Sequence, residues 1–219
     1  MPRQRRIVIP GLAHHVTQRG NYRQKVFERD KDFLLYSKWI NQYAQKNKVA
    51  IVAYCLMSNH VHFVVIPGSK DGLARTFNTA HMRYSQYKNR LKKRKGHLWQ
   101  GRFFSCVLGE THLVNAIRYV EQNPVRAKLT KQAWNYPWSS AGFHVNQSDQ
   151  SPIILKENTI LDKTCWRDSI KIENLELNAQ VRLTTQRGLV FGSPEFIQQV
   201  QNKIGRPLPS LLRGRPKKN

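Results

Sequence analysis

Two apolar segments that lie four residues apart constrain the fold more than any other feature of this 219-residue chain. Residues 49–56 and 61–66 are rich in valine, isoleucine and aromatic residues, which favour strands. Ser58 and Asn59 lie in the connection between them and favour a tight turn. The sequence therefore predicts a β-hairpin that ends at Pro67-Gly68.

Helical periodicity flanks this hairpin on both sides. Before and after it, apolar residues recur at spacings of three and four, the pattern of an amphipathic helix. A further strand is expected at each end, which gives the order β-α-β-β-α-β of a ferredoxin-like split sheet. The helices are expected at residues 30–47 and 69–91, and the outer strands at residues 12–18 and 103–108.

A third helix is expected at about residues 111–123, where Pro124 stops it. The fold class that follows is α+β: a ferredoxin-like antiparallel sheet with two helices on one face and the third helix across the other. We expect residues 1–145 to form the main domain. Residues 146–219 then form a basic C-terminal extension that is mostly helical or irregular.

The charge balance indicates a polyanionic partner. Lysine and arginine number 37 against 13 aspartate and glutamate residues, which gives a net charge of +24. Such a surplus in an otherwise ordinary globular composition suits nucleic acid or an anionic membrane. The sequence has neither a membrane-spanning apolar run nor the apolar stretch of a signal peptide. We therefore expect a cytoplasmic, nucleoid-associated protein that makes no membrane contact.

Two histidines interrupt the second strand of the hairpin. Successive side chains of a strand alternate between faces, so His60 and His62 share a face about 6.5–7 Å apart along the chain. Val61 and Phe63 then point to the opposite face. A lone histidine in such a strand is usually a hydrogen-bonded core residue, whereas two at this spacing can bind one metal ion.

The third helix carries the other polar groups that such a site needs. Tyr119 and Asn123 lie one helical turn apart on a shared face, beside the apolar packing stripe. If this helix crosses the face that carries the histidines, Asn123 can supply a carbonyl oxygen as third ligand and Tyr119 a phenol next to the metal. Two imidazoles and one neutral oxygen leave positions open, as expected for Mg²⁺ or Mn²⁺. The alternative is that Tyr119 simply packs on the core.

These two motifs resemble the signatures of a known superfamily. The His-hydrophobic-His of NHVHFVV and the Tyr-x-x-x-Asn of YVEQNPVRA are similar to those of HUH endonucleases, in their single-tyrosine transposase branch. The LWQGRF block and the tail GRPLPSLLRGRP are similar to REP-associated tyrosine transposases in particular. The resemblance implies that His60, His62 and Asn123 ligate a divalent ion and that Tyr119 is the nucleophile. Related insertion-sequence enzymes place Gln or another polar ligand where Asn123 stands.

The resemblance also implies a reaction and a target. Attack by the phenol on a DNA phosphate gives a 5′-phosphotyrosine and a free 3′-hydroxyl, and the retained bond energy allows the strands to be rejoined. A phenol with a pKa near 10 is a poor nucleophile at neutral pH, so a nearby dication is needed to stabilise developing phenolate. The implied targets are single-stranded and hairpin DNA, namely imperfect palindromes of the REP type.

Basic and aromatic residues that alternate on the second helix and after it suit single-stranded or hairpin DNA, because cations follow the backbone and aromatic rings stack on bases. A solvated cationic helix face is the alternative for many of these lysines. In the tail, Arg213 and Arg215 belong to an Arg-Gly-Arg-Pro sequence that resembles an AT-hook core. The other expected DNA contacts are Arg83, Tyr84, Lys88, Lys92, Lys93, Arg94, Trp99, Gln100 and Arg102.

Two other functions are compatible with parts of this pattern. The ferredoxin-like order is shared with RNA-recognition domains, so a non-catalytic binder of hairpin DNA or RNA is the main alternative. A nuclease that uses a metal-bound water is a further one, but the sequence has few carboxylates near either motif that could serve as additional ligands. Monomer and homodimer are both left open.

Overall fold

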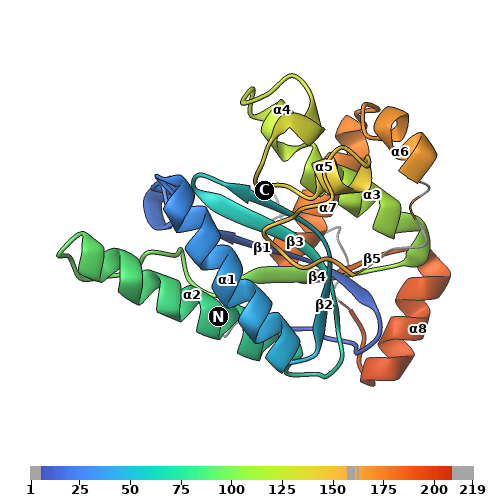
Figure 1. Cartoon of the computed structure of the whole chain (residues 1–219). Helices are drawn as coiled ribbons and strands as arrows, with labels where there is room; N and C mark the ends of the chain where they lie inside the picture. Colours follow the sequence, from blue (N-terminus) through green and yellow to red (C-terminus); the bar gives the residue numbers. More distant parts are fainter. Residues whose placement is uncertain (1–5, 157–160, 162, 209–219) are drawn as a thin grey trace, which may run out of the picture.

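The computed structural model describes residues 6–156, 161 and 163–208. Its centre is one five-stranded sheet with the order β2-β3-β1-β4-β5 (Figure 1). The first four strands pair antiparallel, whereas β5 joins the edge parallel to β4. The predicted α+β class and the order β-α-β-β-α-β along the chain are thereby confirmed. The strands are β1 (Ala13–Arg19), β2 (Val49–Met57), β3 (His60–Pro67), β4 (Phe104–Leu108) and β5 (Val190–Phe191).

The predicted hairpin is present and sets the face on which the two histidines lie. Met57 pairs with His60 next to the turn, and Cys55 pairs with His62. On its other side, β3 pairs with β1, where Thr17 stands opposite His62. Because strand side chains alternate, Val61 and Phe63 go into the core on the opposite face, as expected.

Helices α1 (Asp30–Lys46) and α2 (Gly72–Leu91) cover that opposite face (Figure 1). Their apolar stripes enclose an aromatic-rich core together with β1, β2 and β3. Two leucines of these helices lie outside the buried stripes, since Leu34 is 54% exposed and Leu91 is 48% exposed. The ammonium group of Lys88 on α2 lies 2.9 Å from a carboxylate oxygen of Asp32 on α1, and both side chains are fully buried.

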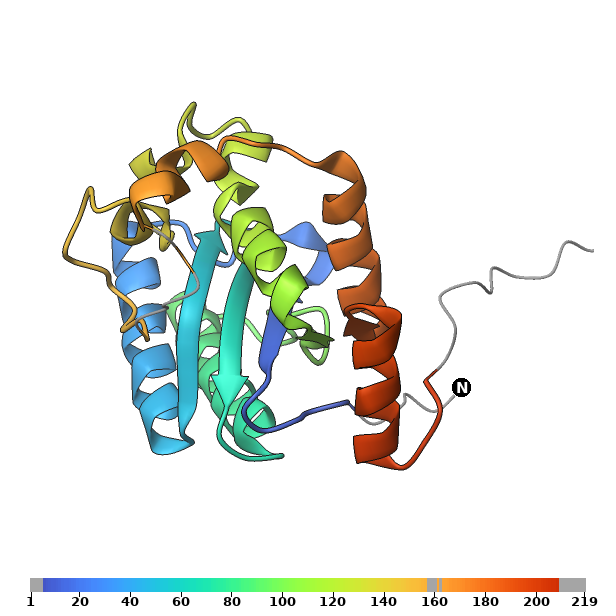
Figure 2. The ribbon, with the colours of Figure 1, turned by 90° about the vertical axis from the view of Figure 1, so that its right-hand side faces the viewer.

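The other face of the sheet is covered by α3 (Glu110–Glu121) and α7 (Leu175–Arg187), which lie side by side in Figure 2. The predicted third helix ends two residues early, at Glu121, and continues after Gln122 as the four-residue helix α4 (Asn123–Arg126), which contains Pro124. The remaining helical segments are η1 (Asn21–Arg23), η2 (Ala133–Asn135), α5 (Ala141–His144), α6 (Lys163–Ser169) and α8 (Pro194–Ile204).

The residues after 145 are packed onto the residues before it. Val190 in β5 pairs with Val107 in β4. The indole nitrogen of Trp166 in α6 donates a hydrogen bond of 2.9 Å to the buried carboxylate of Glu121 in α3. The predicted boundary at residue 145 stays a prediction, although these contacts cross it. Across the described ranges, no helix is long and apolar enough to cross a membrane.

Candidate active site

His60 and His62 lie together on the face of the sheet that α3 covers. Their ring centroids are 4.9 Å apart with an interplanar angle of 82°. His62 is 5% exposed, whereas His60 is half-buried. The shared face follows from the two-residue repeat of the strand, as the sequence predicts. This separation allows both imidazoles to approach one ion.

His15 is a third member of the cluster that the sequence reasoning missed. Its Nε2 lies 2.9 Å from Nδ1 of His62, and the two rings lie edge to edge in nearly the same plane, with centroids 5.2 Å apart. On the other side of its ring, Nδ1 lies 2.7 Å from the hydroxyl oxygen of Thr185 on α7. Strand alternation could have identified His15, because it shares a face with Thr17, but only the strand pairing places that face beside His62.

Tyr119 on α3 packs against this cluster. Its ring centroid is 5.6 Å from those of both His15 and His62, and the rings meet edge to face at 88°. The guanidinium of Arg126 lies 4.5 Å from the Tyr119 ring centroid, and its Nη2 donates to the Tyr119 carbonyl oxygen at 2.6 Å. The third helix therefore does cross the face that carries the histidines.

Asn123 is buried at the junction of α3 and α4. Its Nδ2 donates to the carbonyl oxygens of Tyr119 at 3.0 Å and Val120 at 3.1 Å. The second bond has a local cause: Pro124 has no backbone N–H to donate to the Val120 carbonyl four residues earlier. Because the amide nitrogen is held against the helix, Oδ1 is the atom of Asn123 that remains to serve as a ligand.

Burial keeps the histidines neutral. Desolvation lowers the pKa of His15 to about 3, and desolvation together with Arg19 and Arg126 lowers that of His60 to about 3. The pKa of His62 is also lowered, by burial and by the neighbouring histidines. Imidazoles with such low pKa values are poor general bases, but the neutral ring is the form that binds metal.

The Tyr119 phenol is under two opposing influences. Burial raises its pKa above 10, while the positive charges of Arg126, Arg182 and Arg19 act to lower it. The net pKa is raised, so the phenol is protonated at neutral pH. Further positive charge close to the oxygen is therefore needed for it to act as a nucleophile.

The hydrogen bonds of His60 fit a role as metal ligand. The Nδ2 of Asn59 donates to the Arg23 carbonyl oxygen at 3.3 Å, so its Oδ1 faces His60 Nδ1 at 2.6 Å. Since that oxygen only accepts, His60 carries its proton on Nδ1 and has a lone pair on Nε2. Within the described ranges, no group of three or more His, Cys, Asp and Glu side chains is arranged to hold a metal. A metal here would depend on the two imidazoles and neutral oxygens.

A cavity of about 360 Å³ opens beside Tyr119 and His62. Its cations come from distant parts of the chain, Arg19 from β1 and Arg182 from α7. A cationic hollow next to a phenol can hold a phosphate group. The sequence reasoning assigned Gln100 to DNA binding, and this residue lines the cavity. The other lining residues are His15, Thr17, Gln18, Phe104, Thr185 and Gln186.

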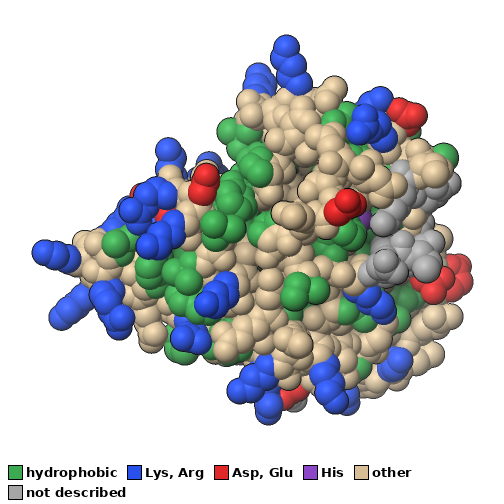
Figure 3. Space-filling view, in the orientation of Figure 1, with side chains coloured by type: hydrophobic (Ala, Val, Ile, Leu, Met, Phe, Trp, Pro, Cys, Tyr) green, Lys and Arg blue, Asp and Glu red, His purple; other side chains and the backbone are tan. Residues whose placement is uncertain are grey.

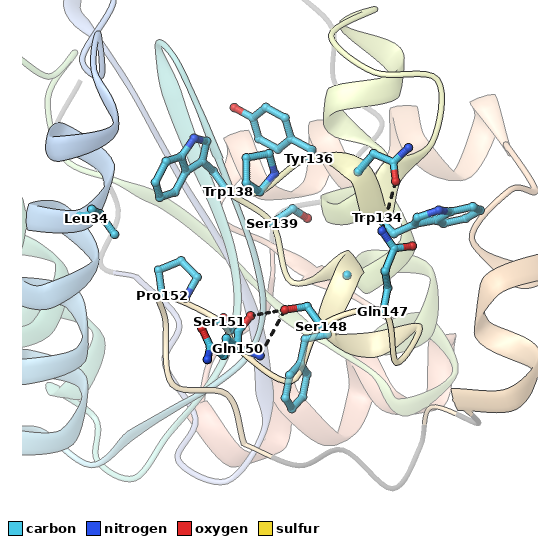
Figure 4. A pocket seen from close by; sticks show the side chains of 14 residues that line it. Leu34, Trp134, Tyr136, Trp138, Ser139, Gln147, Ser148, Gln150, Ser151 and Pro152 are labelled. Atoms are coloured by element: carbon cyan, nitrogen blue, oxygen red, sulfur yellow. Dashed lines mark hydrogen bonds between the residues drawn. The ribbon is translucent and has the colours of Figure 1, made fainter.

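A larger hollow of about 720 Å³ lies between α1 and residues 134–152 (Figure 4). Its walls are aromatic rings, amides and hydroxyls, and no Lys, Arg, His, Asp, Glu or Cys among the described residues lines it. Several of its polar groups bond to one another, as Gln147 Nε2 does to Asn135 Oδ1 at 3.3 Å. This hollow therefore lacks the cationic side chains that the cavity beside Tyr119 offers to a phosphate.

Three of the predicted DNA contacts are wrong, because the residues are buried. Tyr84 is fully buried and donates from its hydroxyl to the Val26 carbonyl oxygen at 2.7 Å. Trp99 is 6% exposed and donates to the His81 carbonyl oxygen at 3.2 Å. Lys88 is enclosed in the ion pair with Asp32. Side chains whose polar atoms bond inside the protein cannot reach a DNA backbone.

The other predicted contacts on and after α2 lie nearer the surface. Figure 3 shows cationic side chains on the end of the molecule where α2 terminates. Arg83 is exposed but already engaged, since its Nη1 donates to the Tyr43 hydroxyl at 2.7 Å. Arg213 and Arg215 lie outside the described residues. Lys92, Lys93, Gln100 and Arg102 are exposed, and Arg94 is half-buried.

The fold and the site together define a class: ferredoxin-like proteins in which a helix tyrosine packs on paired strand histidines. Comparison with known families identifies the member of that class. Residues 9–123, just over half of the chain, match the sequence model of the family described as "Transposase IS200 like". The chain belongs to this family, and the matched segment contains His60, His62, Tyr119 and Asn123.

Two relatives give a finer resemblance. A curated protein of Haemophilus influenzae, named as a REP-associated tyrosine transposase, is 24% identical over 146 residues, which cover 58% of this chain and 82% of the relative. A REP-associated tyrosine transposase solved in complex with a REP hairpin matches with a TM-score of 0.54 and 18% identity, over 72% of this chain and 93% of that one. The predicted resemblance is confirmed, and the structural match shows a shared fold.

Proposed function

We propose that this transposase is a metal-dependent single-strand DNA endonuclease that cleaves and rejoins DNA through a 5′-phosphotyrosine on Tyr119. The observation that carries the proposal is the position of Tyr119. Its ring packs edge to face on His62, and it lines a cavity that also contains Arg19 and Arg182. The phenol of Tyr119, the neutral imidazole of His62 and two cations line this one cavity, and phosphoryl transfer to tyrosine can use each of these groups.

The residues that would hold a divalent ion are His60 and His62 through Nε2, with Asn123 through Oδ1. Mg²⁺ or Mn²⁺ bound there would withdraw electron density from the scissile phosphate and stabilise negative charge. The neutral state of both imidazoles and the Nδ1–H form of His60 support this assignment.

In the proposed cleavage step the Tyr119 oxygen forms a bond to phosphorus, and the bond from phosphorus to the 3′-oxygen breaks. The phenol proton is released to solvent, and the departing oxygen takes up a proton to become a free 3′-hydroxyl. Arg19 and Arg182 line the cavity and would stabilise the charge on the phosphate oxygens. Rejoining is the reverse, in which a 3′-hydroxyl attacks the phosphotyrosine, so no external energy source is needed.

The proposed substrate is a REP-type hairpin with a single-stranded flank. The solved relative was captured with a REP hairpin, and the Haemophilus influenzae relative carries a REP-associated name. The exposed cations Lys93 and Arg102 would follow the DNA backbone. Hairpin recognition by this surface is a proposal about the present chain.

The test is a cleavage assay on single-stranded REP-hairpin oligonucleotides with Mg²⁺, Mn²⁺ or EDTA. A covalent protein–DNA product on denaturing gels should require the metal and be absent from Tyr119→Phe. The exposed Tyr22→Phe is the matched control and should form the product like the wild type. Cleavage that survives Tyr119→Phe would show a water nucleophile, and hairpin binding without any adduct would make the protein a binding module.

A further inference from the structure

A chain of buried hydrogen bonds runs from α7 to His62, and nothing in the proposed reaction so far uses it. It begins at the Val181 carbonyl oxygen, passes through the Thr185 hydroxyl and the His15 ring, and ends at His62. We propose that Thr185 and His15 are positioning residues that fix the tautomer of His62 and so leave its Nε2 free to bind the metal.

The direction of the chain is determined at Thr185. Its Oγ1 lies 2.7 Å from the Val181 carbonyl oxygen, which can only accept, so the single hydroxyl hydrogen is used there. Oγ1 must then accept from His15 Nδ1, 2.7 Å away. The thiol of Cys106, 3.1 Å away, can only add a second donor to the same oxygen.

The proton positions on both rings follow from this. A neutral imidazole has one N–H, so His15 with its proton on Nδ1 has a lone pair on Nε2. That lone pair accepts from Nδ1 of His62 at 2.9 Å. His62 therefore carries its proton on Nδ1 and a lone pair on Nε2, at the edge of the ring away from His15. This is the same tautomer that Asn59 imposes on His60.

Burial makes this chain the determinant of the tautomer. His15 and Thr185 are each 1% exposed and His62 is 5% exposed, so solvent has little access to replace a missing partner. The two imidazoles are nearly coplanar, at an interplanar angle of 5°, and Tyr119 packs edge to face on both. The orientation of the His62 ring and the position of its proton are therefore both fixed by its neighbours. Residues that hydrogen-bond to metal-binding histidines act in this way.

The inference extends the active site beyond the segment that defines the family. Thr185 lies 170 residues after His15 and outside residues 9–123. The same helix supplies Arg182 to the cavity beside Tyr119. Helix α7 is accordingly a component of the active site. The metal-binding part of this inference rests on the proposed function, whereas the tautomers do not.

The first measurement is made without metal. Long-range ¹H–¹⁵N NMR spectra of the ¹⁵N-labelled full chain distinguish Nδ1–H from Nε2–H imidazoles. We expect the Nδ1–H form for His15 and His62 in the wild type and in Thr185→Ser. In Thr185→Val the acceptor is lost, so both rings should change to the Nε2–H form. Unchanged tautomers in folded Thr185→Val would overturn the inference.

The second measurement is Mn²⁺ affinity, followed by the EPR signal of the free ion. Thr185→Val should bind Mn²⁺ about 10- to 100-fold more weakly, the usual effect of losing such a partner. Thr185→Ser should retain the affinity. Thr184→Val is the matched control, because Thr184 is the preceding residue of α7 and is equally buried. Equal losses in Thr184→Val and Thr185→Val would overturn the positioning role.

The two parts can fail separately. Wild-type protein that shows the expected tautomers but binds no Mn²⁺ would refute the proposed metal site and leave the tautomer assignment confirmed. Wild-type protein that binds Mn²⁺ with His62 in the Nε2–H form would refute the inference and the assignment of His62 Nε2 as a ligand atom. Metal-dependent cleavage by Tyr119 would stand as proposed.

Discussion

At the scale of single residues, the setting of Tyr119 explains why its reactivity depends on its neighbours. Its ring is 8% exposed, and burial alone would keep the phenol protonated. Arg126, Arg182 and Arg19 partly offset this, with Arg126 the largest contributor. The charge of Arg126 is therefore expected to act on the Tyr119 phenol, the proposed nucleophile, in addition to any contact with DNA.

Replacing Arg126 with Met should raise the pKa of Tyr119 further, because a positive charge that favours the phenolate is removed. Adduct formation should fall by about tenfold at pH 7.5, and its pH profile should move to higher pH. Initial rates of covalent product between pH 6 and 9 measure both effects. Arg126→Lys keeps the charge and should keep the profile. An unchanged profile in Arg126→Met would show that this charge does not act on the phenol.

At the scale of elements, α1 and α2 are joined by a buried ion pair. Lys88 Nζ reaches Asp32 Oδ2 at 2.9 Å and Glu28 Oε2 at 3.1 Å. Burial opposes ionisation of Asp32, but hydrogen bonds from the Glu28 and Arg29 amides and from Lys88 outweigh it, so its pKa is lowered. The pair holds two helices in register behind the sheet that carries the site.

Lys88→Met should lower the free energy of unfolding by about 3 kcal/mol, because it leaves the Asp32 carboxylate buried without its cation. Urea unfolding followed by circular dichroism measures this. Lys92→Met is the matched control: its ammonium contacts Glu28 at the surface, and its loss should cost less than about 1 kcal/mol. Equal effects of the two substitutions would contradict the structural role of Lys88.

At the scale of the whole molecule, buried histidines make stability depend on pH. Burial lowers the pKa of His14 to about 4 and the pKa values of His15 and His81 to about 3. Below pH 6.5 the unfolded chain binds protons that the folded protein does not, so stability falls as the pH decreases. Each histidine adds to this loss of stability until the pH falls below its pKa in the folded protein.

For the metal-free protein, each of these histidines should lower the free energy of unfolding by about 1.4 kcal/mol per pH unit between pH 6 and 4.5. Urea unfolding at several pH values measures the slope. His81→Gln should reduce the slope of unfolding free energy against pH by about 1.4 kcal/mol per pH unit, the share of one histidine. A slope that His81→Gln leaves unchanged would contradict the buried neutral state of His81.

The extension after residue 145 is also expected to stabilise the molecule as a whole. A chain that ends at residue 145 would lack β5, Trp166 and Thr185, which contact β4, Glu121 and His15. We expect it to unfold at lower urea concentration than the full chain and to bind Mn²⁺ at least tenfold more weakly. Circular dichroism and EPR measure the two effects. Full stability and affinity in the shortened chain would show that residues 1–145 are an autonomous domain.

The sequence by itself determined the features that depend on local periodicity. The two-residue repeat of β3 put His60 and His62 on one face, and the helical repeat brought Tyr119 to within one turn of Asn123. Apolar patterning gave the order of the first four strands and three helices. The two motifs also indicated the family. Both lie within residues 9–123, the segment that the family model matches.

Only the tertiary structure decided which side chains from distant segments meet, because no local repeat encodes pairing across 170 residues. It brought Thr185 to His15 and Arg182 to the cavity beside Tyr119. It likewise buried Lys88, whose place on a cationic helix suggested a DNA contact. A lysine side chain can be exposed or enclosed, and here the carboxylates of Asp32 in α1 and of Glu28 just before it determine which. The active site is therefore encoded locally in its motifs and completed by packing.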